Sequence, residues 1–162
     1  MKTIQHTSIF VLLLVVSITG CTEDDYLLEG FDIPYENIEH YFVKNSYAET
    51  LDSLLTFLII NDTATFNSIY HPAPSWGPPY HWVGPEDFED NFLVGIIREI
   101  SNDIYRFIPK RVYLLNDTLN IKYKSTLIEK NASYSIKCHL MLLIENCPYQ
   151  EIIFYENGEI VK

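Results

Sequence analysis

The chain has 162 residues, of which 48% are hydrophobic and 14% aromatic, and its formal net charge is −11. This apolar content excludes general disorder. The excess of acidic residues argues against a nucleic-acid binder, which needs clustered Lys and Arg to contact phosphates. The length is typical of one domain.

The first 21 residues predict an export signal. Lys2 supplies a positive start, and residues 9–16 are an unbroken apolar run, which is too short to span ~30 Å of hydrocarbon as a lasting transmembrane helix. Residues 18–20 are Ile, Thr and Gly, and Cys21 follows. This ending resembles the lipobox of bacterial lipoproteins. The resemblance implies cleavage of the signal peptide, residues 1–20, and acylation of Cys21 on its sulfur and its new amine, which would anchor the protein durably.

An acidic segment follows this cysteine. Residues 22–43 contain seven Asp or Glu and no Lys or Arg. Because like charges beside an anionic lipid surface repel, residues 21–34 predict a lipidated cysteine with an extended tether, and residues 35–162 the globular domain. Residues 22–25 also resemble the acidic export signal of some Gram-negative lipoproteins, which implies a domain facing outward from the outer membrane. A plain solvated linker is the alternative interpretation.

Two helices are predicted at the start of the globular domain. The first covers residues 46–60, with Ser46 and Glu49 as a capping box. Its apolar residues recur at helical spacing, and they are Leu51, Leu54, Leu55, Leu58 and Ile59. The second helix covers residues 63–70, with Asp62 as its N-cap.

From residue 92 the pattern predicts about six strands arranged as a meander. Residues 92–97 are apolar on both faces, which is typical of a central strand. Turns at residues 116–117 and at Asn157-Gly158 predict two hairpins. The remaining strands are predicted over residues 104–108, 112–115, 118–124, 133–144, 152–155 and 159–161. The fold class is therefore predicted to be α+β, with two N-terminal helices packed on a mostly antiparallel sheet.

Residues 61–162 show a second resemblance. A short helix, the pair Asp87-Phe88, the apolar strand over residues 92–97 and several antiparallel strands resemble the small β-rich domains named after a bacterial protease-complex subunit. Residues 98–102 depart from that pattern, because they replace its Gly-rich turn. The resemblance implies an accessory or binding module rather than a catalyst.

The segment over residues 71–91 holds five of the eight prolines and both tryptophans. Exposed aromatic side chains on such a loop can stack on sugars or fill a partner's pocket, so Trp76, Tyr80 and Trp82 are the predicted recognition residues for a protein or glycan partner. The alternative is that they fold back as a lid over the sheet.

Catalytic motifs of the serine-hydrolase, zinc-protease and phosphate-loop types are absent from the sequence. His71 and His81 lie near carboxylates that suit zinc, but their spacing matches no known motif, and neither a metal site nor a cofactor is predicted. In an alternative interpretation His81 forms an acid–base pair with Glu86 or Asp87.

The remaining cysteines are Cys138 and Cys147. Cys138 and His139 are adjacent in a predicted strand, so their side chains point to opposite faces and cannot meet as nucleophile and base. Cys138 lies on the apolar face, which predicts a buried thiol. A Cys138–Cys147 disulfide and two free thiols are both left open.

These observations favour a lipoprotein of the bacterial envelope, attached to the membrane through Cys21, that acts as a non-catalytic binding or accessory module and does not contact nucleic acid. Two alternatives are an envelope hydrolase with a dispersed His and carboxylate site, and a subunit of a larger envelope complex that binds through the exposed face of its sheet.

Overall fold

The computed structural model describes residues 30–48, 54–73 and 81–162. Most of these residues lie in strands, and the helices are short. In chain order the elements are β1 (Phe31–Asp32), β2 (Tyr35–Asn37), β3 (Tyr41–Val43), α1 (Asn45–Ala48), β4 (Leu55–Ile60), α2 (Thr63–Ile69), β5 (Tyr70–Pro72), α3 (Asp87–Asp90), β6 (Asn91–Arg98), β7 (Ile104–Leu115), β8 (Thr118–Glu129), β9 (His139–Glu145), β10 (Glu151–Glu156) and β11 (Glu159–Ile160).

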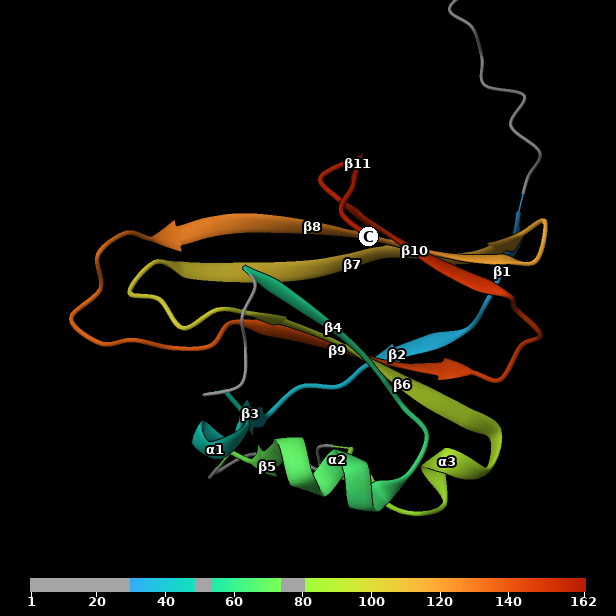
Figure 1. Ribbon diagram of the computed structural model, residues 1–162, viewed down its shortest axis with the longest axis horizontal. Helices are drawn as coiled ribbons and strands as arrows, with labels where there is room; N and C mark the ends of the chain where they lie inside the picture. Colours follow the sequence, from blue (N-terminus) through green and yellow to red (C-terminus); the bar gives the residue numbers. More distant parts are fainter. Residues whose placement is uncertain (1–29, 49–53, 74–80) are drawn as a thin grey trace, which may run out of the picture.

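The elements form three layers (Figure 1). The first layer is a five-stranded sheet in the order β1-β7-β8-β10-β11, and the second is a four-stranded sheet in the order β2-β9-β6-β4. The short β3–β5 pair and α2 make up the third layer, on the far side of the four-stranded sheet. The four-stranded sheet is therefore covered on both faces.

The predicted α+β class with two N-terminal helices on one sheet is wrong. The described part of residues 46–60 holds one helical turn, α1, and the strand β4. Residues 49–53, which include Leu51, lie outside the described residues. Leu54 is 72% exposed and Ile59 is 46% exposed, although the helical pattern predicted both to be buried.

Pairing with β6 explains why this apolar segment is a strand. Each residue of β4 pairs antiparallel with β6, from Leu55 opposite Arg98 to Ile60 opposite Leu93. Alternate residues then serve two cores: Phe57 packs against the core between the two sheets, whereas Ile60 lies in the core beneath the third layer. A segment rich in Leu and Ile fits either period, and here the long-range pairing decides for the strand.

The two large sheets pack face to face around the main core. Val112, Leu119 and Phe154 come from the five-stranded sheet, and Val94 and Leu142 come from the four-stranded sheet. All five side chains are at most 2% exposed. The predicted central strand is confirmed as β6, because its other face, with Leu93 and Ile97, packs in the second core.

Local signals placed three elements correctly. Helix α2 begins after Asp62, whose carboxylate accepts a hydrogen bond of 2.7 Å from the backbone N–H of Thr65. Strands β7 and β8 form the predicted hairpin, but β7 runs unbroken from residue 104 to 115, with a register shift near Pro109. The Asn157-Gly158 turn joins β10 and β11.

The predicted meander is wrong. Strand β10 pairs parallel with β8, and β9, which lies between them in the chain, belongs to the other sheet. The chain thus leaves the first sheet after β8 and returns to it beside the same strand. The order of strands in space depends on how the two sheets close around the core, and no local turn signal encodes it.

Candidate functional site

The structure brings His81 together with two carboxylates. Its Nδ1 lies 2.8 Å from Oε2 of Glu36 in β2, and its Nε2 lies 2.8 Å from Oδ1 of Asp87 in α3. The second oxygen of Asp87 accepts a hydrogen bond of 2.7 Å from the backbone N–H of Gly84. His81 therefore fastens the segment that leads into α3 to a strand 45 positions earlier in the chain.

These contacts determine the protonation of the ring. Burial lowers the pKa of His81, but hydrogen bonds to Glu36 and Asp87, with the charges of both, outweigh burial and raise the pKa above the ordinary 6.5. A carboxylate accepts hydrogen bonds, so both ring nitrogens donate in this arrangement. An imidazole with both nitrogens occupied offers no lone pair as a general base. The predicted His81–Asp87 pair is thus present, in a geometry that suits a structural clasp.

Trp82 lies beside this clasp. Its side chain is 52% exposed, and its ring packs edge-on against Tyr41 with centroids 6.0 Å apart. The hydroxyl of Tyr41 accepts a hydrogen bond of 2.9 Å from the backbone N–H of Val83. Trp82 thus packs against Tyr41 and leaves about half of its surface exposed to solvent. Trp76 and Tyr80, the other two predicted recognition residues, lie outside the described residues, as does Cys21.

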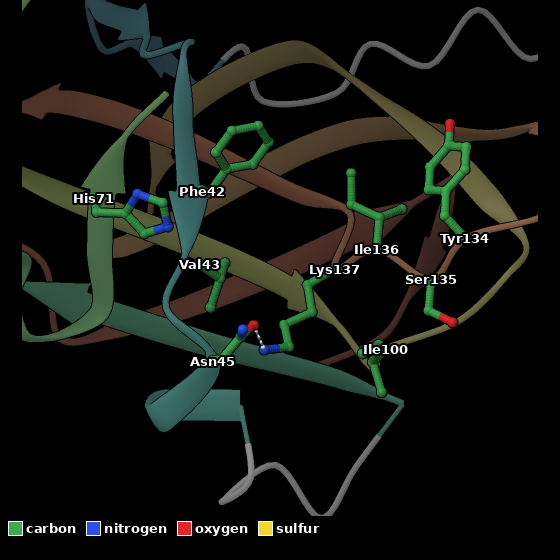
Figure 2. Close-up of a pocket in the computed structure, with 9 residues that line it drawn as sticks. All are labelled: Phe42, Val43, Asn45, His71, Ile100, Tyr134, Ser135, Ile136 and Lys137. Carbon is green, nitrogen blue, oxygen red and sulfur yellow. Dashed lines mark hydrogen bonds between the residues drawn. The ribbon is translucent and has the colours of Figure 1, made fainter. Parts of the chain in front are cut away.

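A cavity of about 320 Å³ opens on another part of the molecule, between the third layer and the segment before β9 (Figure 2). Phe42 and His71 face each other across the β3–β5 pair, with ring centroids 5.8 Å apart. The backbones of Ser101 and Ile136 exchange two hydrogen bonds, which hold the opposite wall in place. The lining residues are Phe42, Val43, Asn45, His71, Ile100, Tyr134, Ser135, Ile136 and Lys137.

Lys137 is the charged residue of this cavity, and its side chain is only 8% exposed. Figure 2 shows it extending from the wall toward α1. Its Nζ lies 3.5 Å from the carbonyl oxygen of Lys44 and 3.5 Å from Oδ1 of Asn45. Charged side chains are rarely buried to this degree, because desolvation is costly. A cation among aromatic and aliphatic side chains suits a small anion with an apolar body.

Sequence reasoning missed Lys137, and long-range contacts explain its position. The neighbouring Ile136 and Cys138 belong to one small apolar cluster, whereas the side chain of Lys137 extends toward Asn45 in α1. Lys137 lies just before β9, and its contacts come from Lys44 and Asn45, which lie 93 and 92 positions earlier in the chain. These partners are distant in the chain, so no local pattern in the sequence indicates the burial of Lys137.

The cysteines in the described residues are free. Cys138 is 7% exposed, as predicted, and its sulfur accepts a hydrogen bond of 3.1 Å from the backbone N–H of Tyr105. Cys147 is partly buried and makes no disulfide with Cys138. Burial, with the nearby charge of Glu145, raises the pKa of the Cys147 thiol. The surroundings of Cys147 therefore do not activate its thiol as a nucleophile.

His139, predicted to lie apart from Cys138, packs its ring 5.9 Å from that of Tyr70. Burial lowers its pKa below 6.5, against the opposing effect of hydrogen bonds to backbone. Within residues 30–48, 54–73 and 81–162, no cluster of three or more His, Cys, Asp and Glu side chains could hold a metal ion. His71 and His81 take part in separate contacts, with Phe42 and with the clasp.

Among the helices of the described residues, none combines the length and the apolar character needed to cross a bilayer. Comparisons with protein-family models, with curated proteins and with solved structures found no match for this chain.

Proposed function

We propose that this chain is a lipid-anchored lipoprotein of the bacterial envelope and a non-catalytic binding module, which takes a small anionic molecule in the Lys137 cavity. The single observation that supports binding is a lysine, 8% exposed, in the wall of a cavity that also holds three aromatic rings. The volume of about 320 Å³ is near the lower end of ordinary ligand sites, which corresponds to a small ligand.

The chemistry of the lining residues limits the ligand class. Lys137 supplies one positive charge, and Asn45 supplies an amide that can donate to an oxygen. Phe42, Val43 and Ile136 supply apolar surface for the rest of the molecule. A monocarboxylate with an aromatic or short aliphatic body satisfies both requirements, whereas a neutral analogue gains no charge attraction from Lys137.

Calorimetric titration of the full chain in mild detergent tests this proposal with four probes: benzoate, hexanoate, benzamide and hexanamide. We expect at least one of the two carboxylates to bind and its neutral amide to bind much more weakly. The Lys137→Met variant should weaken carboxylate binding roughly tenfold or more, because it removes a charged contact of ~1.5–3 kcal/mol. Lys130→Met, which removes an exposed lysine outside the cavity, is the matched control.

Equal binding of a carboxylate and its amide, or carboxylate binding that survives Lys137→Met, would contradict the proposal. A thermal unfolding scan of each variant shows whether a loss of binding reflects a loss of the fold.

The anchor has a separate test that does not depend on the ligand. Metabolic labelling with an alkyne-bearing palmitate in a Gram-negative host should label the full chain in the membrane fraction. Cys21→Ser should abolish the label and release the protein, and Cys147→Ser should change neither. Labelling that persists in Cys21→Ser would overturn the lipoprotein assignment while leaving the Lys137 cavity to be judged by its own experiment.

Trp82 is the described member of the predicted recognition residues, and we propose that it contacts a protein or glycan partner. Its support is the 52% exposure of a tryptophan ring that is packed on one side against Tyr41. Retention on immobilised peptidoglycan should fall for Trp82→Ala and not for Phe31→Ala, which removes another exposed ring. Equal retention of both variants would exclude a role for Trp82 in this binding.

A further inference from the structure

Among the residues that the structure describes, strand β8 has an open edge over its second half. Its first half, Thr118 to Tyr123, pairs with the whole of β10, but β8 continues to Glu129. On its other side β7 follows it to the end. In Figure 1 the arrowhead of β8 extends well beyond the β10–β11 hairpin. Residues 124–129 therefore form a sheet edge, and such an edge can pair with another chain.

The hydrogen bonds at the turn show which backbone groups face this edge. The carbonyl of Tyr123 accepts from the N–H of Asn157 at 3.0 Å, and the N–H of Ser125 donates to Oδ1 of Asn157 at 3.1 Å. Backbone groups of a strand alternate between its two sides. The carbonyl of Ser125 and both backbone polar groups of Leu127 therefore point to the open side, as the next rungs of the ladder.

A groove of about 720 Å³ runs along this edge. Its lining residues are Lys110, Lys122, Tyr123, Lys124, Ser125, Thr126, Leu127, Asn157 and Gly158. Three of these nine are lysines and none is acidic, although the whole chain has a net charge of −11. The ammonium of Lys122 lies 5.2 Å from the ring centroids of Tyr113 and Tyr155.

Apolar side chains accompany the lysines. Leu127 is 42% exposed and the next residue, Ile128, is 52% exposed. Within the described parts of the chain, neither Lys110 nor Lys124 forms a salt bridge. As far as the described residues go, the edge thus combines backbone groups without a strand partner, lysines without a salt bridge, and exposed apolar surface.

We propose that this groove binds an extended, acidic peptide segment of a partner protein, which adds as a strand beside residues 124–127 of β8. Strand addition satisfies the free backbone groups of Ser125 and Leu127. Carboxylates of the peptide meet the lysines, and apolar residues between those carboxylates cover Leu127. An acidic glycan would match the lysines, but it lacks the two-residue backbone repeat that the open ladder requires.

The opposing possibility is that these lysines only protect the edge from pairing, which is a common use of lysine on edge strands. The two interpretations differ in what happens when an acidic strand is supplied. Protection predicts no specific binding, whereas strand addition predicts binding that depends on both the peptide charge and the peptide backbone.

Fluorescence anisotropy of the full chain in mild detergent, with a fluorescein-labelled peptide of four Glu-Val repeats as the probe, tests the proposal. A Lys-Val repeat of the same length controls for charge. A Glu-Val repeat N-methylated at every second residue keeps the charge and loses the ladder hydrogen bonds. We expect binding of the unmodified acidic peptide alone.

Two protein variants locate the binding. Lys110→Gln with Lys124→Gln should weaken it roughly fivefold to tenfold, since two exposed ion pairs are lost. Arg106→Gln with Lys130→Gln removes the same charge from exposed positions outside the groove and should leave it nearly unchanged. Failure of the acidic peptide to bind, equal binding of the N-methylated peptide, or equal weakening by both variants would overturn the proposal.

Discussion

Gly95 occupies the middle of β6, where a side chain would collide with the third layer. A Cβ added at Gly95 would lie 2.5 Å from the hydroxyl oxygen of Tyr70 and 3.5 Å from the Cβ of Leu58. Tyr70 is 1% exposed, and within the described residues its hydroxyl has no hydrogen-bond partner. His71, which lines the Lys137 cavity, follows Tyr70 directly in β5. The packing of Tyr70 against Gly95 therefore also supports the wall of the candidate site.

The expected effect of Gly95→Ala follows from two opposing terms. Alanine stabilises a strand interior by ~0.5–1 kcal/mol relative to glycine. Overpacking of a rigid core costs ~1–3 kcal/mol. We therefore expect Gly95→Ala to lower the free energy of unfolding by about 1–2 kcal/mol.

Tyr70→Phe removes the atom that collides. It also removes a buried hydroxyl without a partner, so it should leave the free energy of unfolding unchanged or raise it by up to about 1 kcal/mol. In the Tyr70→Phe background, Gly95→Ala should become neutral or stabilising. The two substitutions should thus couple by about 1–3 kcal/mol.

Urea unfolding of the wild type, the two single variants and the double variant measures this coupling. The slope of the free energy against urea concentration must stay constant across the four proteins, so that each midpoint reports stability. Additivity of the two substitutions to within ~0.5 kcal/mol would refute the contact between Gly95 and Tyr70. A Gly95→Ala variant as stable as the wild type would show that the third layer can shift without cost.

Three further predictions concern the strand, the clasp and the thiols. If residues 55–60 are a strand, urea unfolding should show that Ile59→Ala changes the free energy of unfolding by less than ~1 kcal/mol and that Ile60→Ala lowers it by ~2–5 kcal/mol. A larger loss of stability for Ile59→Ala than for Ile60→Ala would favour a helix. The raised pKa of His81 gives a stabilising contribution that is complete below about pH 6.5 and declines as the pH rises through the folded-state pKa. The difference in the free energy of unfolding between wild type and His81→Gln should therefore shrink from pH 5.5 to pH 8.5. A difference that grows with pH would contradict the clasp. Maleimide should modify Cys147 in the native protein and Cys138 only in the unfolded protein, as measured by mass spectrometry of peptides. Equal labelling rates in the native protein would show that Cys138 is accessible.

Short-range chemistry in the sequence predicted several elements correctly. The N-cap of α2 needs only Asp62 and the N–H of Thr65, three residues away. The β7–β8 and β10–β11 turns need only Asn116-Asp117 and Asn157-Gly158, all four of which adopt positive φ angles. Each of these signals is complete within a few residues, so it can be recognised without knowledge of the fold.

The segment over residues 46–60 shows where such reasoning fails. Its apolar residues match the helical period, and its free energy as an isolated segment does not decide between helix and strand. Pairing with β6, more than 30 residues later, buries Phe57 and Ile60 on opposite sides of one sheet. A helix would bury a single stripe and would leave the edge of β6 without a partner.

The sequence alone predicted the export signal and the acidic tether, and it also located the turns, the cap of α2 and the two-sided burial of β6. Each of these features depends on neighbouring residues. Only the tertiary structure decided the strand order, the Glu36–His81–Asp87 clasp, the burial of Lys137 and the open edge of β8. Each of these features requires segments that are distant in the chain to meet. Their positions depend on how the two sheets close around the core, and this closure balances the burial of all the apolar strands at once.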